Sequence, residues 1–266
     1  MGLPFRPAKS GATTNFEQAL ACRLLYTRTN QMSTAYFDFT ESLNYFLPRL
    51  QRNENIPLAF QGRQSLKHLI ESLGVPHTEA GSVLVNGESR ELSHIPRDGD
   101  RIEVRSEAAP PPIEPRFILD GHLGRLNAYL RMLGFDCLYQ NDYDDKDLAK
   151  LIQHEERILL TRYRRLLMRK VVKYGYCPRS LDPTVQLTEI VRRFDLTGKI
   201  VPFHRCLRCN HLLEPVSKEA ILERLEPLTK KYFDDFRICP ACEQIYWKGS
   251  HYELMQKLIA GAVHGT

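Results

Sequence analysis

The sequence lacks any run of about 18 apolar residues, which excludes a transmembrane helix. Its first 31 residues hold four basic side chains and no apolar stretch of signal-peptide length, so we expect no secretory signal. Disulfides are also not expected, because seven is an odd number of cysteines and no leader points to an oxidising compartment. These absences together predict a cytoplasmic protein without membrane contact, with residues 1–31 as a disordered extension.

Charge of neither sign dominates the chain. The 37 Lys and Arg exceed the 32 Asp and Glu by five, a mildly basic balance that is compatible with an anionic partner but does not identify one. Hydrophobic residues make up 42% and charged residues 26%, as in ordinary globular proteins. A length of 266 residues then suggests about two domains and room for a small extra module.

Residues 32–105 show the pattern of a small α+β domain. Strands are predicted at residues 35–39, 56–60, 82–85 and 101–105. A helix is predicted to begin after Ser65 and to end at Gly74. The Asn86-Gly87 pair favours a tight hairpin.

The phrase VLVNG at residues 83–87, followed by DGD at 98–100, resembles the β-grasp fold of ubiquitin and the sulfur carriers. A carrier needs a free Gly-Gly end, whereas this chain continues into a Pro-rich linker at residues 106–115. We therefore expect a docking or stabilising module that recruits a protein partner.

The segment at residues 116–200 indicates an α/β domain. Strands are predicted at 117–119, 135–139 and 158–161, and helices at 121–133 and 145–155. This alternation predicts a parallel sheet, and ligands of such sheets bind at the carboxyl ends of the strands. Asp120, Asp142 and the loop after Thr161 should therefore converge on one edge.

Acids at such an edge suit Mg²⁺ or Mn²⁺, which can promote hydrolysis of a phosphodiester. Asp120 and Asp142 are the first candidates. Asp145 has two open interpretations, the N-cap of the following helix and a catalytic acid. Asp144 and Asp147 are interpreted as a solvated face.

Residues 162–173 contain six Lys or Arg and no acid. This stretch suits a polyanion such as RNA, and a solvated helix face is the alternative interpretation. Tyr163 lies within it and could stack on an unpaired base. The candidate RNA contacts are Arg125, Arg162, Tyr163, Arg164 and Arg165.

Several phrases resemble the PIN-like ribonuclease domain of the Mut-seven C-terminal family. They are FILD at 117–120, LGRL at 123–126, LRMLGFD at 130–136 and ILLTR at 158–162. A ubiquitin-like module commonly precedes this domain, so the resemblance spans about residues 33–260. It implies a metal-dependent ribonuclease with Asp120, Asp142 and Asp145 at the positions of the catalytic acids.

One departure from the family pattern bears on activity. The family usually has TRDR, whereas residues 161–164 read TRYR, and a neutral Tyr is a poor ligand for Mg²⁺. Two alternatives to the ribonuclease therefore stay open. One is an inactive RNA-binding adaptor, and the other is a protein-interaction module.

Four cysteines form two Cys-x-x-Cys pairs, Cys206 with Cys209 and Cys239 with Cys242. Two such knuckles complete a closed tetrahedral site for structural zinc, with an iron–sulfur cluster as the alternative. We expect residues 201–266 to form a zinc ribbon with a terminal helix. A helix at 217–231 capped by Ser217, a strand at 245–247 and packing or base stacking by Trp247 complete this prediction. YWKGSH at 246–251 is similar to the closing phrase of the same family.

Overall fold

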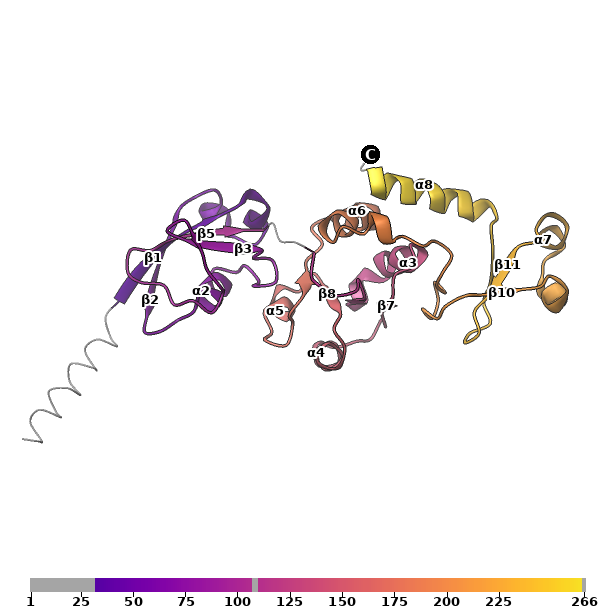
Figure 1. Ribbon diagram of the computed structural model, residues 1–266, viewed down its shortest axis with the longest axis horizontal. Helices are drawn as coiled ribbons and strands as arrows, with labels where there is room; N and C mark the ends of the chain where they lie inside the picture. The colour runs from indigo at the N-terminus through magenta and orange to yellow at the C-terminus, as the bar shows by residue number, and fades with distance from the viewer. Residues whose placement is uncertain (1–31, 107–109, 265–266) are drawn as a thin grey trace, which may run out of the picture. The chain divides into compact units, whose positions relative to one another are not determined.

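The computed structural model describes residues 32–106 and 110–264 (Figure 1). The disordered extension expected at residues 1–31 lies outside the described residues. The chain divides into two compact units. Among the described residues, the first comprises 32–73 and Ser82–Arg105, and the second comprises Gly74–Gly81, Ser106 and 110–264. No helix within the described ranges is long and apolar enough to cross a membrane.

The first unit is a mixed five-stranded sheet with one α-helix. Its strands are β1 (Met32–Phe39), β2 (Ile56–Gln61), β3 (Ser82–Val85), β4 (Glu88–Ser89) and β5 (Arg101–Arg105), in the order β2-β1-β5-β3-β4. β1 runs antiparallel to β2 and parallel to β5. The helix α2 (Leu66–Ser72) begins where Ser65 Oγ accepts the His68 amide, and two short 3₁₀ turns follow β1, η1 (Glu41–Tyr45) and η2 (Arg49–Gln51).

The hairpin between β3 and β4 forms as predicted. Asn86 and Gly87 both have positive φ, 51° and 85°, as a two-residue type I′ turn requires. The mixed sheet and single helix confirm the α+β class expected for this domain.

The second unit contains a parallel four-stranded sheet. Its strands are β6 (Phe117–Leu119), β7 (Cys137–Leu138), β8 (Ile158–Leu160) and β9 (Gly175–Tyr176), in the order β7-β6-β8-β9. The strands are connected by the 3₁₀ turn η3 (Gly121–Leu123) with α3 (Gly124–Met132), by α4 (Asp145–His154) and by α5 (Arg164–Leu167). The helix α6 (Pro183–Arg193) and the 3₁₀ turn η4 (Thr197–Lys199) follow the last strand. Right-handed crossovers to opposite sides of β6 place α3 and α4 on opposite faces (Figure 1).

The strand predicted at residues 135–139 is shorter than expected. The end of α3 takes its first residues, because the Gly134 amide bonds to Arg131 O and the Phe135 amide to Leu130 O. Gly134 adopts φ +97°, the left-handed conformation of a helix C-cap. Only Cys137–Leu138 remains to pair with β6.

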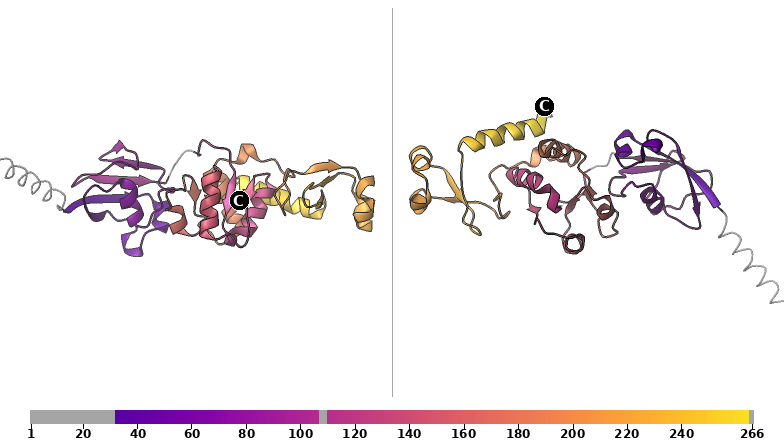
Figure 2. Two further views of the ribbon diagram at one scale, coloured as in Figure 1. Left: turned by 90° about the horizontal axis from the view of Figure 1, so that it is seen from below. Right: turned by 180° about the vertical axis from the view of Figure 1, so that it is seen from behind.

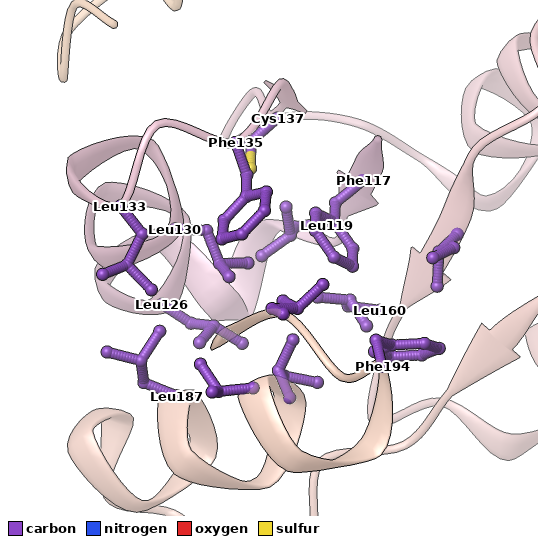
Figure 3. Close-up of a cluster of buried hydrophobic side chains, with 14 of the residues drawn as sticks. Phe117, Leu119, Leu126, Leu130, Leu133, Phe135, Cys137, Leu160, Leu187 and Phe194 are labelled. Atoms are coloured by element: carbon purple, nitrogen blue, oxygen red, sulfur yellow. The ribbon is translucent and has the colours of Figure 1, made fainter. Parts of the chain in front are cut away.

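The hydrophobic core of this sheet lies under α3 and α6 (Figure 3). The ring of Phe117 meets those of Phe135 and Phe194 edge to face, each at 5.9 Å between centroids. Leu126 from α3 and Leu187 from α6 are fully buried against the same cluster. This packing fixes the strands whose carboxyl ends carry the candidate site.

The four-cysteine region forms an antiparallel sheet in the order β10-β11-β12. Its elements are β10 (Glu214–Val216), η5 (Glu219–Arg224), α7 (Pro227–Tyr232), β11 (Phe236–Ile238), β12 (Ile245–Trp247) and α8 (Ser250–His264). The single helix predicted at 217–231 is wrong. Pro227 begins a separate helix, and Glu226 before it takes the extended conformation that a following proline imposes. The last helix, α8, packs along α6 (Figure 2).

The loop Gly74–Gly81 belongs to the second unit, although α2 and β3 of the first unit flank it in sequence. Glu79 is buried there, and its Oε2 lies 2.7 Å from Nη2 of Arg179. Its Oε1 accepts the Cys177 amide at 2.7 Å. A buried carboxylate is tolerated because each of its oxygens is paired.

Candidate active site and metal centre

Asp120 directly follows β6 and is only 2% exposed. Its Oδ1 accepts the His122 amide at 2.9 Å. Its Oδ2 accepts the Thr161 hydroxyl at 2.5 Å and the Arg162 amide at 3.2 Å. A carboxylate offers about four lone-pair sites, and these three hydrogen bonds leave one that could accept a further contact. Asp120 therefore ties the end of β6 to the end of β8 and keeps a fixed orientation.

The order in which strands are added to the sheet reverses between β6 and β8. The chain leaves β6 toward α3 and leaves β8 toward α5, and these helices lead to strands on opposite sides of the β6–β8 pair. Ligands of open parallel sheets bind in the crevice at such a switch point. Asp120 thus stands where the topology provides a binding site.

The loop that carries Asp142 lies against the residue after Asp120. Tyr139 donates its hydroxyl hydrogen to Gly121 O at 2.9 Å. A Cβ atom added at Gly121 would lie 2.7 Å from the carbonyl oxygen of Asn141, so the close approach requires glycine. Asp142, the next residue, is exposed and lines a hollow of about 320 Å³ with Asp147.

The N-cap of α4 is Asp144, and the prediction that Asp145 caps this helix is wrong. Asp144 Oδ1 accepts the amides of Lys146 and Asp147 at 2.7 and 2.8 Å. These backbone hydrogen bonds hold the pKa of Asp144 below its usual value. Two adjacent aspartates offer two possible cap registers, and the sequence alone does not choose between them. The catalytic role of Asp145 stays a prediction.

The side chain of Asp145 lies outside what the structure describes, and the described carboxylates of this edge form no three-acid cage. Within residues 32–106 and 110–264, the four cysteines are the one group of three or more Cys, His, Asp or Glu close enough to share a metal ion. Mg²⁺ commonly takes one or two protein carboxylates and fills its other positions with water and substrate phosphate. Asp120 and Asp142 match that smaller donor set in residue type, and a metal ion shared by them stays a prediction.

Tyr163, at the position where the family pattern has an acid, faces the same edge. It is 51% exposed, and its amide donates to Thr161 Oγ1 at 3.0 Å. Its hydroxyl lies 3.3 Å from Nε2 of His122. His122 was not among the predicted site residues, although its place two residues after Asp120 was a signal. His122 Nδ1 lies 3.8 Å from Asp120 Oδ1, so an imidazole lies beside the buried carboxylate.

The predicted RNA contacts surround this edge. Arg164 and Arg165 are exposed in α5, Arg162 is half-buried between β8 and α5, and Arg125 is exposed in the first turn of α3. The basic stretch is not one solvated helix face, because α5 ends at Leu167, which is fully buried. Arg162, Arg164 and Arg165 thus belong to the loop and helix that follow β8, and the Arg162 amide reaches Asp120 at the end of β6.

The four cysteines come together as predicted. Their Sγ atoms all lie within 4.8 Å of one another, with Cys206 3.5 Å from Cys242 and Cys209 3.3 Å from Cys239. A Zn–S distance of about 2.3 Å in a tetrahedron gives sulfur separations of about 3.8 Å, so these residues could hold a metal such as Zn²⁺. Such a centre is closed and stabilises the fold without an open position for chemistry.

Tyr246 supports this centre from β12. Its hydroxyl lies 3.2 Å from Cys206 Sγ and accepts the Leu207 amide at 3.0 Å. Burial raises the pKa of Cys206, but the hydrogen bonds from Tyr246 and from backbone amides outweigh it and lower the pKa to about 6. Burial raises the pKa of Cys209 to about 12 and also raises that of Cys242, so the lowered pKa is confined to Cys206.

Trp247 follows Tyr246 and contacts Phe236 at 6.4 Å between ring centroids. It also lines an apolar pocket of about 370 Å³ together with Phe203 and Tyr252. These contacts support the packing role of Trp247, and base stacking by its ring stays a prediction.

Comparison with protein families gives two matches. The model of the Mut7-C RNAse domain matches residues 115–259, more than half of the chain. The model of the Mut7-C ubiquitin domain matches residues 32–111. Searches of curated proteins and of solved structures gave no match.

Proposed function

The chain belongs to the Mut7-C RNAse domain family, and from this premise we propose that it is a metal-dependent ribonuclease that hydrolyses RNA phosphodiester bonds. The reaction would take place at the carboxyl edge of β6, β7 and β8. One observation carries the proposal. The loop of Asp142 lies against Gly121, directly beside the buried Asp120, at the switch point of a parallel sheet.

Each residue of this edge would have a distinct role. Mg²⁺ or Mn²⁺ held by Asp120 and Asp142 would stabilise the charge of the phosphate and supply an activated water nucleophile. Three hydrogen bonds hold Asp120 in place, so its carboxylate needs no reorganisation during the reaction. Asp145 would assist from the start of α4. Phosphates on either side of the cleaved bond would contact Arg125, Arg162, Arg164 and Arg165.

A non-catalytic RNA-binding protein is the second candidate, and Tyr163 favours it. The exposed phenol can stack on an unpaired base but supplies no carboxylate to a metal ion. The same arginines would then hold RNA without cleaving it. The two candidates share RNA binding and differ only in chemistry.

Two further assignments belong to this proposal. The four-cysteine centre would hold structural zinc, and its thiolates, with buried Cys137 and Cys177, suit the reducing conditions of the cytoplasm. The ubiquitin-like unit would recruit a protein partner, as the absence of a Gly-Gly end leaves it no carrier chemistry.

The test is cleavage of a panel of labelled RNAs by the purified full chain. Mg²⁺ and Mn²⁺ are compared with omission of both, because a chelator would also attack the four-cysteine centre. Asp142→Asn is the first variant, since Asp142 is exposed and its loss should not affect folding. Asp195→Asn, at an exposed position outside this edge, is its matched control.

We expect metal-dependent cleavage that persists in Asp195→Asn and falls at least about a hundredfold in Asp142→Asn. Asp120→Asn should be as inactive, with its melting temperature recorded because three donors point at that carboxylate. RNA binding without cleavage would select the second candidate. Absence of both would refute RNA as the substrate.

A further inference from the structure

We infer that the substrate is single-stranded RNA that runs from the acidic edge along a groove to the first zinc knuckle, where Arg208 contacts its backbone. This inference rests on the proposed function and adds the form of the substrate and its path. The evidence is a second hollow next to the one that contains Asp142. We call it the knuckle groove.

The knuckle groove has a volume of about 580 Å³ and lies between the end of β7 and the first cysteine pair. Three arginines line it, Arg131, Arg205 and Arg208. None of the described residues that line it is acidic. A concave surface with this charge suits a chain of phosphates. Tyr139 and Tyr143 also line it, and they favour RNA over an acidic peptide because bases can stack on their rings.

The knuckle groove and the Asp142 hollow are neighbours. Gln140 and Tyr143 line both of them. The Asp142 hollow contains Asp142 and Asp147, whereas the knuckle groove contains the arginines. An acidic hollow followed by a basic groove suits a nuclease, in which acids act at the cleaved phosphate and cations hold the neighbouring phosphates.

Two of the three arginines have structural roles. Arg131 is buried and donates to the carbonyl oxygens of Cys137, Leu207 and Arg208, at 2.8 to 3.2 Å. Arg205 donates to Gly134 O at 3.3 Å and to Asn210 O at 3.0 Å. Both fix the knuckle against the end of α3, and Arg205 is also paired with Asp136 at 3.8 Å, so Arg208 carries the charge that a phosphate would meet.

Arg208 is the arginine whose side chain is exposed. It lies between Cys206 and Cys209, and its carbonyl oxygen accepts from Arg131 Nη1 at 3.0 Å. The metal knuckle thus provides a rigid support for a cation at the rim of the groove. A point contact of this kind positions a phosphate without reading sequence.

The aromatic walls favour a single strand over a duplex. Tyr139 and Tyr143 are half-buried, and Leu138 lies beside them. Unpaired bases can enter such a recess and stack on tyrosine, whereas a duplex keeps its base faces covered and presents only phosphate and sugar. We therefore expect discrimination between the two forms of RNA.

The experiment measures binding of fluorescein-labelled 12-mers to the full chain, as a single strand and as a duplex, without added Mg²⁺ or Mn²⁺. The variants are Arg208→Glu, Arg208→Gln and Tyr143→Leu. Arg192→Glu is the matched control, because Arg192 is an exposed arginine of α6 that lines neither hollow. Zinc content and cleavage are measured for every variant.

We expect the single strand to bind at least about tenfold more tightly than the duplex. Arg208→Glu should weaken single-strand binding about tenfold or more. Arg208→Gln should reduce the slope of log K against log salt concentration by about one, which corresponds to the loss of one phosphate contact. Tyr143→Leu should weaken the single strand more than the duplex. Arg192→Glu should change affinity less than about twofold.

The inference is overturned if Arg208→Glu with full zinc content binds like Arg192→Glu, or if duplex and single strand bind alike. It is also overturned if both Arg208 variants lose zinc, because Arg208 would then serve the metal centre. Failure of the proposed function has a different signature. If the chain binds single strands through Arg208 but never cleaves them, the groove is supported as an RNA-binding site and the ribonuclease activity is refuted.

Discussion

The hydroxyl of Tyr163 lies 3.3 Å from Nε2 of His122, and their rings meet edge to face at 5.3 Å between centroids. Tyr163 follows β8 and His122 follows β6, so the contact joins the two strand ends that Asp120 also connects. The phenol occupies the place at which the family pattern has an acid. Its effect on activity can therefore be measured by a single exchange.

Tyr163→Asp should raise metal-dependent RNA cleavage at least about tenfold, because a third carboxylate at this edge would strengthen metal binding. Tyr163→Asn is the matched control, as it removes the same ring without adding charge. Initial rates over a range of Mn²⁺ concentrations separate metal affinity from turnover. Equal rates for the two variants would show that no acid is required at this position.

Gly121→Ala should impair the site while the fold persists. The new Cβ would meet the carbonyl oxygen of Asn141 at 2.7 Å, a backbone contact that can be relieved only if the Asp142 loop moves. We expect a loss of about 1–3 kcal/mol in stability and a larger proportional fall in cleavage. Gly198→Ala is the control, since nothing lies within 4 Å of its added Cβ. Unchanged cleavage by Gly121→Ala would separate the Asp142 loop from catalysis.

The sequence predicted the elements whose signals are local. Ser65 caps α2 as expected, Asn86-Gly87 forms its hairpin, and the strand at 117–119 has the predicted bounds. Each depends on backbone chemistry within a few residues, as capping and turn geometry do. The cysteine pairs belong to the same class, because each knuckle is a short motif.

Other features depend on contacts that the sequence does not reveal. The cap register at Asp144 is decided by which aspartate reaches the first free amides. The placement of Glu79 in the second unit depends on Arg179, which lies 100 residues further along the chain. The contact between His122 and Tyr163 depends on the pairing of β6 with β8, which places the two residues side by side. Long-range pairing of this kind leaves no periodic signal in one sequence.

Asp136→Asn should weaken the second unit at neutral pH and have less effect in acid. Burial raises the pKa of Asp136, but hydrogen bonds from Arg157 at 2.8 Å and Asn210 at 2.9 Å outweigh it and lower the pKa below its usual 3.8. The ionised form therefore stabilises the fold above about pH 4, and this contribution is lost as pH falls through the lowered value.

Urea unfolding at pH 7 should show a loss of about 2–3 kcal/mol for Asp136→Asn, since buried Arg157 would keep Glu155 as its ion-pair partner but lose the charge of Asp136. The difference from the native chain should shrink below pH 4. Asp235→Asn breaks an exposed pair with Lys248 and should cost less than about 1 kcal/mol at either pH. A loss that is independent of pH would assign the effect of Asp136→Asn to packing.

Removal of metal from the four-cysteine centre should unfold the antiparallel sheet around it. Structural zinc supplies about 10–16 kcal/mol of apparent binding free energy at pH 7, more than so small a core provides on its own. Trp247 is the only tryptophan of the chain and lies in β12, directly after Tyr246, whose hydroxyl contacts Cys206 Sγ. Its fluorescence therefore reports on this region alone.

We expect about one zinc ion per chain and a red shift of Trp247 emission when a chelator removes it. Cys239→Ser should lose the metal and show the shifted emission without chelator. Cys177→Ala is the matched control, because Cys177 is a buried thiol outside the cluster and its loss should leave zinc content unchanged. Iron in place of zinc, or emission that does not respond to its removal, would contradict a structural zinc centre.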